Sequence, residues 1–280
     1  MDWKRIRRIV IGRWNWKRPF ISLASIYILL AITACSFADR IIFQPPPRSY
    51  TSELAGLKMM SEGGTEPIAL IHLKAPPGAP TIIYSHGNAE DIGQNMDIFM
   101  EWHDAGFGVI AYDYPGYGLS PGISTETTTE ESIKRVWDYA VAAGIPPSSL
   151  VIIGRSIGSG PSVWLASSVD PAGLILISPL KSAFTTAIPL PFAIFPGDRF
   201  PNLKRIKNIK TPLLVIHGEN DRVIPASHGR AIHENSPAAR KSFIGIPDAG
   251  HNDLFAVGPD EIFTETSVFI KEVTESSPSE

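Results

Sequence analysis

The chain of 280 residues has little cysteine, little net charge and few basic runs, and each shortage excludes a class of protein. Its single Cys excludes a disulfide framework and a zinc site built on cysteines. The net charge is −3 and no long basic run follows Arg18, so the sequence offers no extended basic surface for binding nucleic acids without sequence specificity. The 25 prolines and 23 glycines are dispersed, which excludes collagen-like and low-complexity sequences. What remains is a globular composition, 44% hydrophobic and 19% charged.

The N-terminal segment, residues 1–34, differs in charge from everything that follows. It carries seven Lys and Arg and one Asp, so its net charge is +6 and that of the remaining chain is −9. The basic stretch ends at Arg18 and is followed by an apolar, uncharged run, PFISLASIYILLAITA. A basic flank before an apolar run is typical of an export signal whose positive end stays in the cytoplasm. We therefore expect residues 1–34 to be a signal peptide or a membrane anchor.

The only cysteine, Cys35, follows this apolar run directly. The sequence LAITAC that ends at Cys35 resembles a bacterial lipobox, which implies cleavage before Cys35, a lipid on that residue and a lipoprotein of the bacterial cell envelope. The alternative is an uncleaved anchor, because the stretch from Pro19 to Ala38 carries no charge and is long enough to span a bilayer core. Both alternatives place the domain on the extracytoplasmic side of a membrane. Residues 35–49, with their proline-rich QPPPR segment, are expected to form an extended tether that holds the domain away from the bilayer.

From about residue 50 onward, short apolar runs alternate with amphipathic segments. Nearly all-apolar runs are typical of buried parallel strands, and apolar residues at helical spacing indicate helices. Repeated βα units predict an α/β domain over residues 50–280, with a mostly parallel central sheet and helices on both faces. Strands are expected at 66–74, 81–85, 107–112, 150–153, 173–177, 211–216 and 241–246, and helices at 95–105, 128–143, 157–167, 202–209, 227–235 and 261–273.

One segment, residues 181–200, interrupts this alternation. It is rich in proline and aromatic residues and has no clean periodicity. Long irregular segments inside compact domains usually serve a function. We therefore expect a short cap over a site, the alternative being a loop that packs on the surface.

The motif with the clearest chemistry is GRSIG at residues 154–158, a G-x-S-x-G between a predicted strand and a predicted helix. In that context the motif forms a tight elbow that exposes the serine hydroxyl at the carboxyl edge of the sheet. The N-terminus of the next helix then lies beside the oxyanion that develops during acyl transfer. The motif therefore predicts Ser156 as a nucleophile, rather than as a structural serine in a turn.

A serine nucleophile needs a base, and the base needs an acid that orients it. Both are expected to follow the serine in the chain. Asp221 lies after a strand and His251 after the last strand and a turn, so they are predicted as acid and base. Asp253 is the alternative acid because it lies close to His251 in the sequence. His217, at the end of its strand, is expected to be structural.

Two backbone N–H groups, those of Asn88 and Ile157, are the predicted donors of an oxyanion hole. Ile157 follows the nucleophile, and Asn88 lies in the His-Gly-Asn sequence directly after the strand at 81–85, the usual place for the second donor. The alternative is a simple glycine turn in which His86 is buried and hydrogen-bonded. Asp113 precedes the nucleophile in the chain and is expected to hold the turn that follows it.

Residues from about 50 to 275 resemble the α/β-hydrolase superfamily, and within it the BEM46-like family with its animal depalmitoylase relatives. Seven blocks in order carry the resemblance: YSHGNAEDIG, DYPGYGLSPG, GRSIGSGP, LISPL, FPNLKRI, IHGENDRVIPASHG and GHND. It implies the α/β-hydrolase fold and a catalytic triad at Ser156, Asp221 and His251. It does not transfer the substrate, because the depalmitoylase relatives attach to membranes through a Cys-rich N-terminus that is absent from this sequence.

Together these interpretations predict a membrane-tethered serine hydrolase. Its substrates are expected to be small-molecule or lipid esters or thioesters, cleaved through an acyl-serine intermediate. Such chemistry requires no metal ion and no organic cofactor. Two alternatives stay open: a serine peptidase or amidase that uses the same triad, and an envelope binding protein on a hydrolase fold that has lost its activity.

Overall fold

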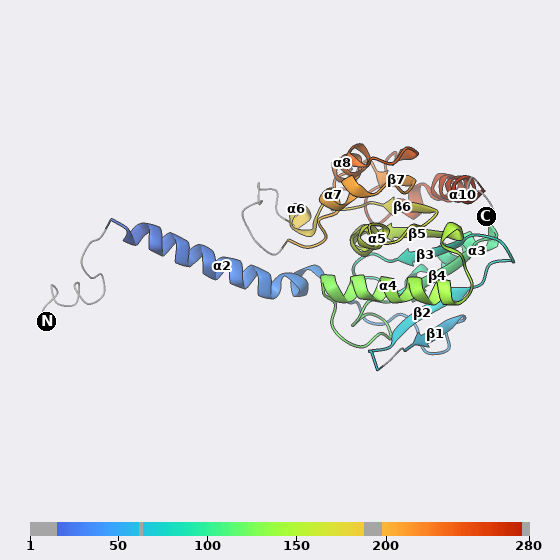
Figure 1. Cartoon of the computed structure of the whole chain (residues 1–280), viewed down its shortest axis with the longest axis horizontal. Coiled ribbons are helices and arrows are strands. Elements are labelled where there is room, and N and C mark those ends of the chain that lie inside the picture. Colours follow the sequence, from blue (N-terminus) through green and yellow to red (C-terminus); the bar gives the residue numbers. More distant parts are fainter. Residues whose placement is uncertain (1–15, 62–63, 188–197, 276–280) are drawn as a thin grey trace, which may run out of the picture.

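The apolar runs of the chain pair into one sheet of eight strands, in the order β1-β2-β4-β3-β5-β6-β7-β8 (Figure 1). The computed structural model describes residues 16–61, 64–187 and 198–275. β1 pairs antiparallel with β2 and β2 antiparallel with β4, whereas every other pairing is parallel. The strands are β1 (Leu57–Met60), β2 (Ile68–Leu73), β3 (Thr81–Ser85), β4 (Gly108–Tyr112), β5 (Leu150–Arg155), β6 (Gly173–Ile177), β7 (Leu213–Gly218) and β8 (Lys241–Ile246).

The chain forms nine helices in its described part, and those after α2 lie around the sheet, on both of its faces (Figure 1). The nine are α2 (Arg18–Ile42), α3 (Met96–Asp104), α4 (Glu126–Ala142), α5 (Ser159–Ala166), α6 (Ala183–Ala187), α7 (Asn202–Arg205), α8 (Ser227–Asn235), α9 (Leu254–Val257) and α10 (Pro259–Glu275). Short 3-10 turns lie at Ile92–Asn95, Pro147–Ser149, Ser156–Gly158 and Ile206–Asn208. The mostly parallel sheet with helices on both faces confirms the α/β-hydrolase fold expected from the sequence.

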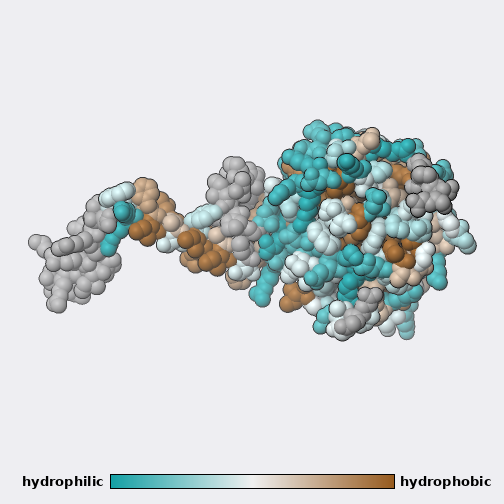
Figure 2. All heavy atoms as spheres, in the orientation of Figure 1, coloured by the Kyte–Doolittle hydropathy of each residue, from teal (hydrophilic) through white to brown (hydrophobic). Residues whose placement is uncertain are grey.

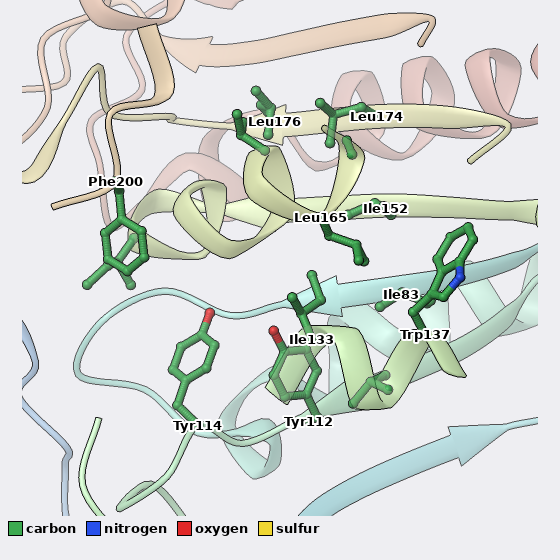
Figure 3. Close-up of a cluster of buried hydrophobic side chains, with 14 of the residues drawn as sticks. Ile83, Tyr112, Tyr114, Ile133, Trp137, Ile152, Leu165, Leu174, Leu176 and Phe200 are labelled. Atoms are coloured by element: carbon green, nitrogen blue, oxygen red, sulfur yellow. The ribbon is translucent and has the colours of Figure 1, made fainter. Parts of the chain in front are cut away.

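Two apolar layers, one on each face of the sheet, form the core. Successive side chains of a strand point to opposite faces. Ile152 of β5 therefore joins the layer under α4, α5 and α8, whereas Ile153 joins the layer under α3 and α10. Figure 3 shows the first layer, in which Ile133 and Trp137 of α4 lie near Leu165 of α5. Because both faces are covered, the central strands β3, β4, β6 and β7 are buried along their whole length.

The predicted strands and helices all lie within two residues of observed ones, the helix predicted at 202–209 being α7 with the 3-10 turn that follows it. The sequence analysis missed β1 and the short helices α6 and α9. β1 is a four-residue edge strand whose two central residues are exposed, so it lacks the apolar run that marked the other strands.

The N-terminal helix α2 projects from the domain, and its apolar side chains face outward (Figures 1 and 2). In the described part of the chain, no single helix has the length and apolar character needed to cross a membrane. Two segments, Arg18–Thr33 and Ser36–Ile42, meet at a bend of 46°. Taken together, and judged by length and composition alone, they are long and apolar enough to cross a membrane. Cys35 lies between these segments, and its side chain is outside the described part of the structure, so its lipidation stays a prediction.

The expected tether at residues 35–49 differs from a free spacer. Its first residues continue α2 as far as Ile42, and the next residues pack against the domain. Phe43 and Tyr50 are buried, and the N–H of Ser49 donates to Asp91 Oδ2 at 2.7 Å. The aromatic side chains at both ends of the proline-rich segment explain this docking, because burying them removes a large apolar area from water. The end of α2 is therefore held against the domain.

Candidate active site

Ser156 lies in a sharp turn between β5 and α5, as the motif predicts. Its φ of +53° lies in the left-handed region that residues with a Cβ adopt rarely. Two glycines make the turn sterically possible: a Cβ on Gly154 would lie 2.5 Å from Ser162 Oγ, and one on Gly158 would lie 2.2 Å from the carbonyl oxygen of Ser85. The turn thus packs directly on the end of β3, where the loop with Asn88 begins.

The structure brings the three predicted residues Ser156, His251 and Asp221 together. Ser156 Oγ lies 2.9 Å from His251 Nε2, and His251 Nδ1 lies 2.7 Å from Asp221 Oδ2. The Asp221 carboxylate is fully buried, so the proton of the neutral imidazole is best placed on Nδ1. His251 Nε2 is then left to accept the proton of Ser156, which is the arrangement that general-base activation of a serine requires.

The loop after β7 keeps Asp221 ionised. Its Oδ1 accepts hydrogen bonds from the N–H groups of Val223 and Ile224 at 2.9 and 2.8 Å. Burial by itself would raise the pKa of Asp221, but hydrogen bonds from His217 and His251 outweigh it and hold that pKa well below its usual range. The acid is therefore a carboxylate at any pH at which His251 acts as a base.

His217 lies against the acid, which the sequence analysis did not predict. Its Nε2 donates to the carbonyl oxygen of Ile224 at 2.7 Å and lies 3.3 Å from Asp221 Oδ2. Asp253, the alternative acid, lies elsewhere: its Oδ1 accepts the N–H of Gly250 at 2.6 Å. The geometry therefore brings Asp221, and not Asp253, to the imidazole of His251.

Asn88 and Ile157 line one cavity with Ser156, as an oxyanion hole requires. The loop that carries Asn88 is tightly held: Ala89 has a φ of +57°, and the N–H of Gly87 donates to Glu90 Oε1. Glu90 Oε2 in turn accepts a hydrogen bond from Arg155 Nη1 at 2.6 Å. Since Arg155 directly precedes the nucleophile, this ion pair ties the loop to the elbow.

A buried histidine and a buried aspartate lie next to each other at the start of the same loop. His86 Nε2 lies 3.4 Å from Asp113 Oδ1, and His86 Nδ1 bonds to the carbonyl oxygen of Gly87 at 2.7 Å. Burial lowers the pKa of His86, but the hydrogen bond and charge of Asp113 raise it more, so the net direction is upward. The sequence analysis expected only a buried histidine and a turn-holding aspartate. Only a weak sequence signal indicated that these two residues pair, namely that each directly follows a strand.

The cavity over Ser156 has a volume of about 670 Å³. Its larger apolar side chains come from four segments, namely the end of α2, the elbow, the chain from Leu180 into α6 and the loop after β7: Ile41, Ile42, Ile157, Leu180, Ala183, Val223 and Ile224. Its polar side chains are those of Asn88, Glu90, Gln94, Arg155, Thr186 and Asn252, besides Ser156 and His251. Within the described ranges, no group of three His, Cys, Asp or Glu side chains is arranged to hold a metal ion.

The predicted cap at residues 181–200 is described in part. Ala183 and Thr186 of α6 line the cavity, so this end of the segment does lie over the site. Residues 188–197 are outside the described part of the chain. The cap therefore stays a prediction for that stretch.

Comparison with known proteins shows which proteins the chain is similar to. Residues 77–204 match a family model described as "Serine aminopeptidase, S33". Human alpha/beta hydrolase domain-containing protein 17B is 37% identical over 199 residues, which cover 68% of this chain and 67% of that protein. Alpha/beta hydrolase domain-containing protein aho-3 of Caenorhabditis elegans is 40% identical over 179 residues, 62% of this chain and 53% of that one. The chain thus spans between about half and two thirds of the length of these relatives.

Solved structures with the same fold include esterases and lipases. The Pyrococcus furiosus esterase Pf2001 matches with a TM-score of 0.65 at 18% identity, over 82% of this chain and 97% of that one. A soluble variant of monoglyceride lipase from Saccharomyces cerevisiae matches with a TM-score of 0.59 at 14% identity, over 81% and 99%. At these identities the likeness concerns the fold alone.

Proposed function

The chain belongs to the α/β-hydrolase superfamily, and we propose that within it the protein is a membrane-tethered serine hydrolase that cleaves carboxylic esters or thioesters. The observation that carries this proposal is the 2.9 Å contact between Ser156 Oγ and His251 Nε2, with His251 oriented by a buried carboxylate. A serine held in a strained turn and bonded to an oriented imidazole has the geometry of an activated nucleophile.

The proposed reaction has two halves. Ser156 Oγ attacks the acyl carbon while His251 Nε2 takes its proton, and Asp221 stabilises the imidazolium. The N–H groups of Asn88 and Ile157 stabilise the tetrahedral oxyanion, and one such donor is typically worth about 3–4 kcal/mol of barrier. His251 then gives its proton to the leaving oxygen or sulfur, which leaves an acyl ester on Ser156. Water, deprotonated by His251, attacks this ester, and the carboxylic acid and the free serine result.

The cavity lining supports an apolar acyl group. Isoleucine, leucine, valine and alanine side chains from four segments surround the nucleophile, and burial of each acyl methylene against them contributes about 0.8 kcal/mol. The polar side chains of the cavity suit a polar alcohol or thiol leaving group.

The description of the matching family model, "Serine aminopeptidase, S33", suggests aminopeptidase activity as a competing function. Such an enzyme needs an unpaired carboxylate near the nucleophile to bind the substrate ammonium group. The acidic side chain that lines the cavity is Glu90, and its two oxygens are occupied by the N–H of Gly87 and by Arg155. This pairing favours ester and thioester substrates over peptides with a free amino terminus.

The N-terminal segment supports the membrane tether. Phe20, Leu23 and Leu29 of α2 are each more than 60% exposed, and apolar side chains form patches on the surface of the helix (Figure 2). Seven Lys and Arg precede these apolar residues, and the last of them is Arg18. We propose that this segment directs the chain to a membrane with its basic end in the cytoplasm, which places the domain outside it, and that cleavage then leaves Cys35 as a lipid-carrying N-terminus; the alternative is an uncleaved anchor that stays in the bilayer.

A substrate panel tests the proposed function. The full chain in detergent is assayed on p-nitrophenyl esters of increasing acyl length, on acyl thioesters and on aminoacyl p-nitroanilides, with Ser156→Ala as the control. We expect ester and thioester turnover that Ser156→Ala abolishes. Preferential anilide cleavage would establish the peptidase instead. Absence of turnover on all three, together with intact folding, would favour a binding protein on a retired hydrolase fold.

A further inference from the structure

The end of α2 is bonded to the loop that carries the proposed oxyanion donor Asn88. Asn88 Nδ2 donates to the carbonyl oxygen of Ile42 at 2.6 Å, and Asn88 Oδ1 accepts the N–H of Gln44 at 3.0 Å. The hydroxyl of Tyr117 donates to the same Oδ1 at 2.7 Å. The N–H of Ala89 also donates to Oδ1, at 3.1 Å. Both polar atoms of this side chain are therefore held, and two of their four hydrogen bonds come from backbone 44 to 46 residues earlier in the chain.

We propose that residues 42–44, where the anchor helix meets the domain, are a positioning element for catalysis. The inference rests on the proposed serine hydrolase mechanism, in which the N–H of Asn88 stabilises the oxyanion. By fixing the side chain of Asn88, the junction fixes the peptide unit whose N–H faces the reacting carbonyl. The next residue, Ala89, has a φ of +57°, a conformation that costs free energy and persists only where neighbouring contacts hold it.

The same junction is also anchored to the helix that follows the nucleophile. Phe43 is buried and meets the ring of Phe200 edge to face, with the ring centroids 6.0 Å apart. Phe200 packs so closely on α5 that a Cβ on Gly160 would lie 2.3 Å from its ring. One turn before the end of α2, Asp39 accepts a hydrogen bond from Arg199 Nε at 2.9 Å. The junction therefore bridges the loop of Asn88 and the helix that begins beside Ile157.

A consequence follows for the tethered enzyme. The orientation of α2 relative to the domain and the geometry of the oxyanion hole depend on the same contacts. A displacement of the junction moves the donor away from the oxyanion, and misplacement by about 1 Å is enough to cost up to ~10²-fold in rate. Turnover then depends on how the anchor is seated, while substrate binding in the cavity changes less.

A single backbone N–H can be removed to test this. Gln44→Pro deletes one of the donors to Asn88 Oδ1, the one that comes from the junction, and the preceding Phe43, with φ −90° and ψ 123°, already has a conformation that a following proline allows. Gln44→Ala is the matched control, since it keeps the N–H and loses only the side chain. In the full chain in detergent, we expect kcat for an ester to be about 10- to 100-fold lower for the Pro variant than for the Ala variant. KM is expected to differ by less than about threefold, because ground-state binding is unchanged.

A double-mutant cycle with Asn88→Ala gives a second readout. This variant removes the clamped side chain, keeps the backbone N–H and leaves residues 42–44 unaltered, so it is informative even where Gln44→Pro disturbs folding. We expect Asn88→Ala to lower kcat by at least a similar factor, and Gln44→Pro to have little further effect in its presence, because the contact that Gln44→Pro removes is already lost with the Asn88 side chain. The affinity for a trifluoromethyl ketone, whose tetrahedral adduct places an oxyanion in the hole, should fall in proportion to kcat.

Three results would overturn the inference: equal kcat for the Pro and Ala variants, additive effects in the cycle, or a change confined to KM. Melting temperatures of all variants check that the fold is retained. An active wild-type enzyme with any of these results refutes the positioning role alone. A wild-type chain without ester or thioester turnover refutes the proposed function, and this inference with it.

Discussion

Replacing Asp221 by Asn isolates the role of the buried carboxylate in orienting His251. Asparagine has almost the same shape, and its side-chain oxygen can keep the hydrogen bonds from the N–H groups of Val223 and Ile224. Its NH₂ group then faces His251 Nδ1, which lies 2.7 Å from the present oxygen. The amide donates where the carboxylate accepted, so the imidazole must carry its proton on Nε2. That nitrogen can no longer accept the proton of Ser156.

The expected loss in kcat is about 10⁴-fold, or about 5.5 kcal/mol of transition-state stabilisation. Flipping the amide does not restore activity, because its NH₂ group would then face two N–H donors. Ester hydrolysis is measured near pH 8, and the melting temperature verifies that the variant is folded. Asp253→Asn is the matched control: its side-chain oxygen can still accept the N–H of Gly250, so we expect activity within about threefold of wild type. If Asp221→Asn kept more than a tenth of the activity while Asp253→Asn abolished it, the acid would be misassigned.

Three further predictions concern the protonation state, the elbow and the N-terminus. The logarithm of kcat/KM should rise with pH with a slope of no more than one, because the pKa of Asp221 is held well below its usual range and this carboxylate adds no ionisation of its own; a slope of two would show that a second group must also ionise. Gly158→Ala should lower kcat by at least about 10²-fold, because the new Cβ would lie 2.2 Å from the carbonyl oxygen of Ser85 and push the two oxyanion donors apart; near-normal kcat in steady-state assays would refute this. Mass spectrometry of protein from a host that processes lipoproteins should give a chain that begins at a lipid-modified Cys35, and an intact chain with a free thiol there would contradict lipidation.

The sheet and the triad were predictable from the sequence because their signals are local. Buried parallel strands such as β3 and β6 are uninterrupted apolar runs, since helices cover both faces. Ser156 was marked by its glycines between a strand and a helix. Asp221 and His251 were marked by their places after later strands, because in this type of sheet the carboxyl ends of the strands meet at one edge.

The contacts that surround the triad were not predictable in the same way. The side chain of Asn88 meets backbone atoms 44 to 46 residues earlier, and no periodicity or motif indicates that a proline-rich segment will dock there. His86 and Asp113 are each ordinary residues after a strand, and only the pairing of β3 with β4 brings them to 3.4 Å. Such pairings depend on the register and on loop geometry, which a single sequence does not encode locally.

The acyl-serine intermediate at Ser156 is the central claim, and trapping it is the most direct test. The full chain is incubated with a fluorophosphonate, or with an ester whose acyl-enzyme breaks down slowly, and the modified peptide is identified by mass spectrometry. The account predicts one adduct, on Ser156 within the GRSIG motif, with no adduct on Ser156→Ala, whose kcat falls by about 10⁴- to 10⁶-fold. Ester hydrolysis by a folded wild-type enzyme with Ser156 unmodified, or with the adduct on another residue, would contradict it.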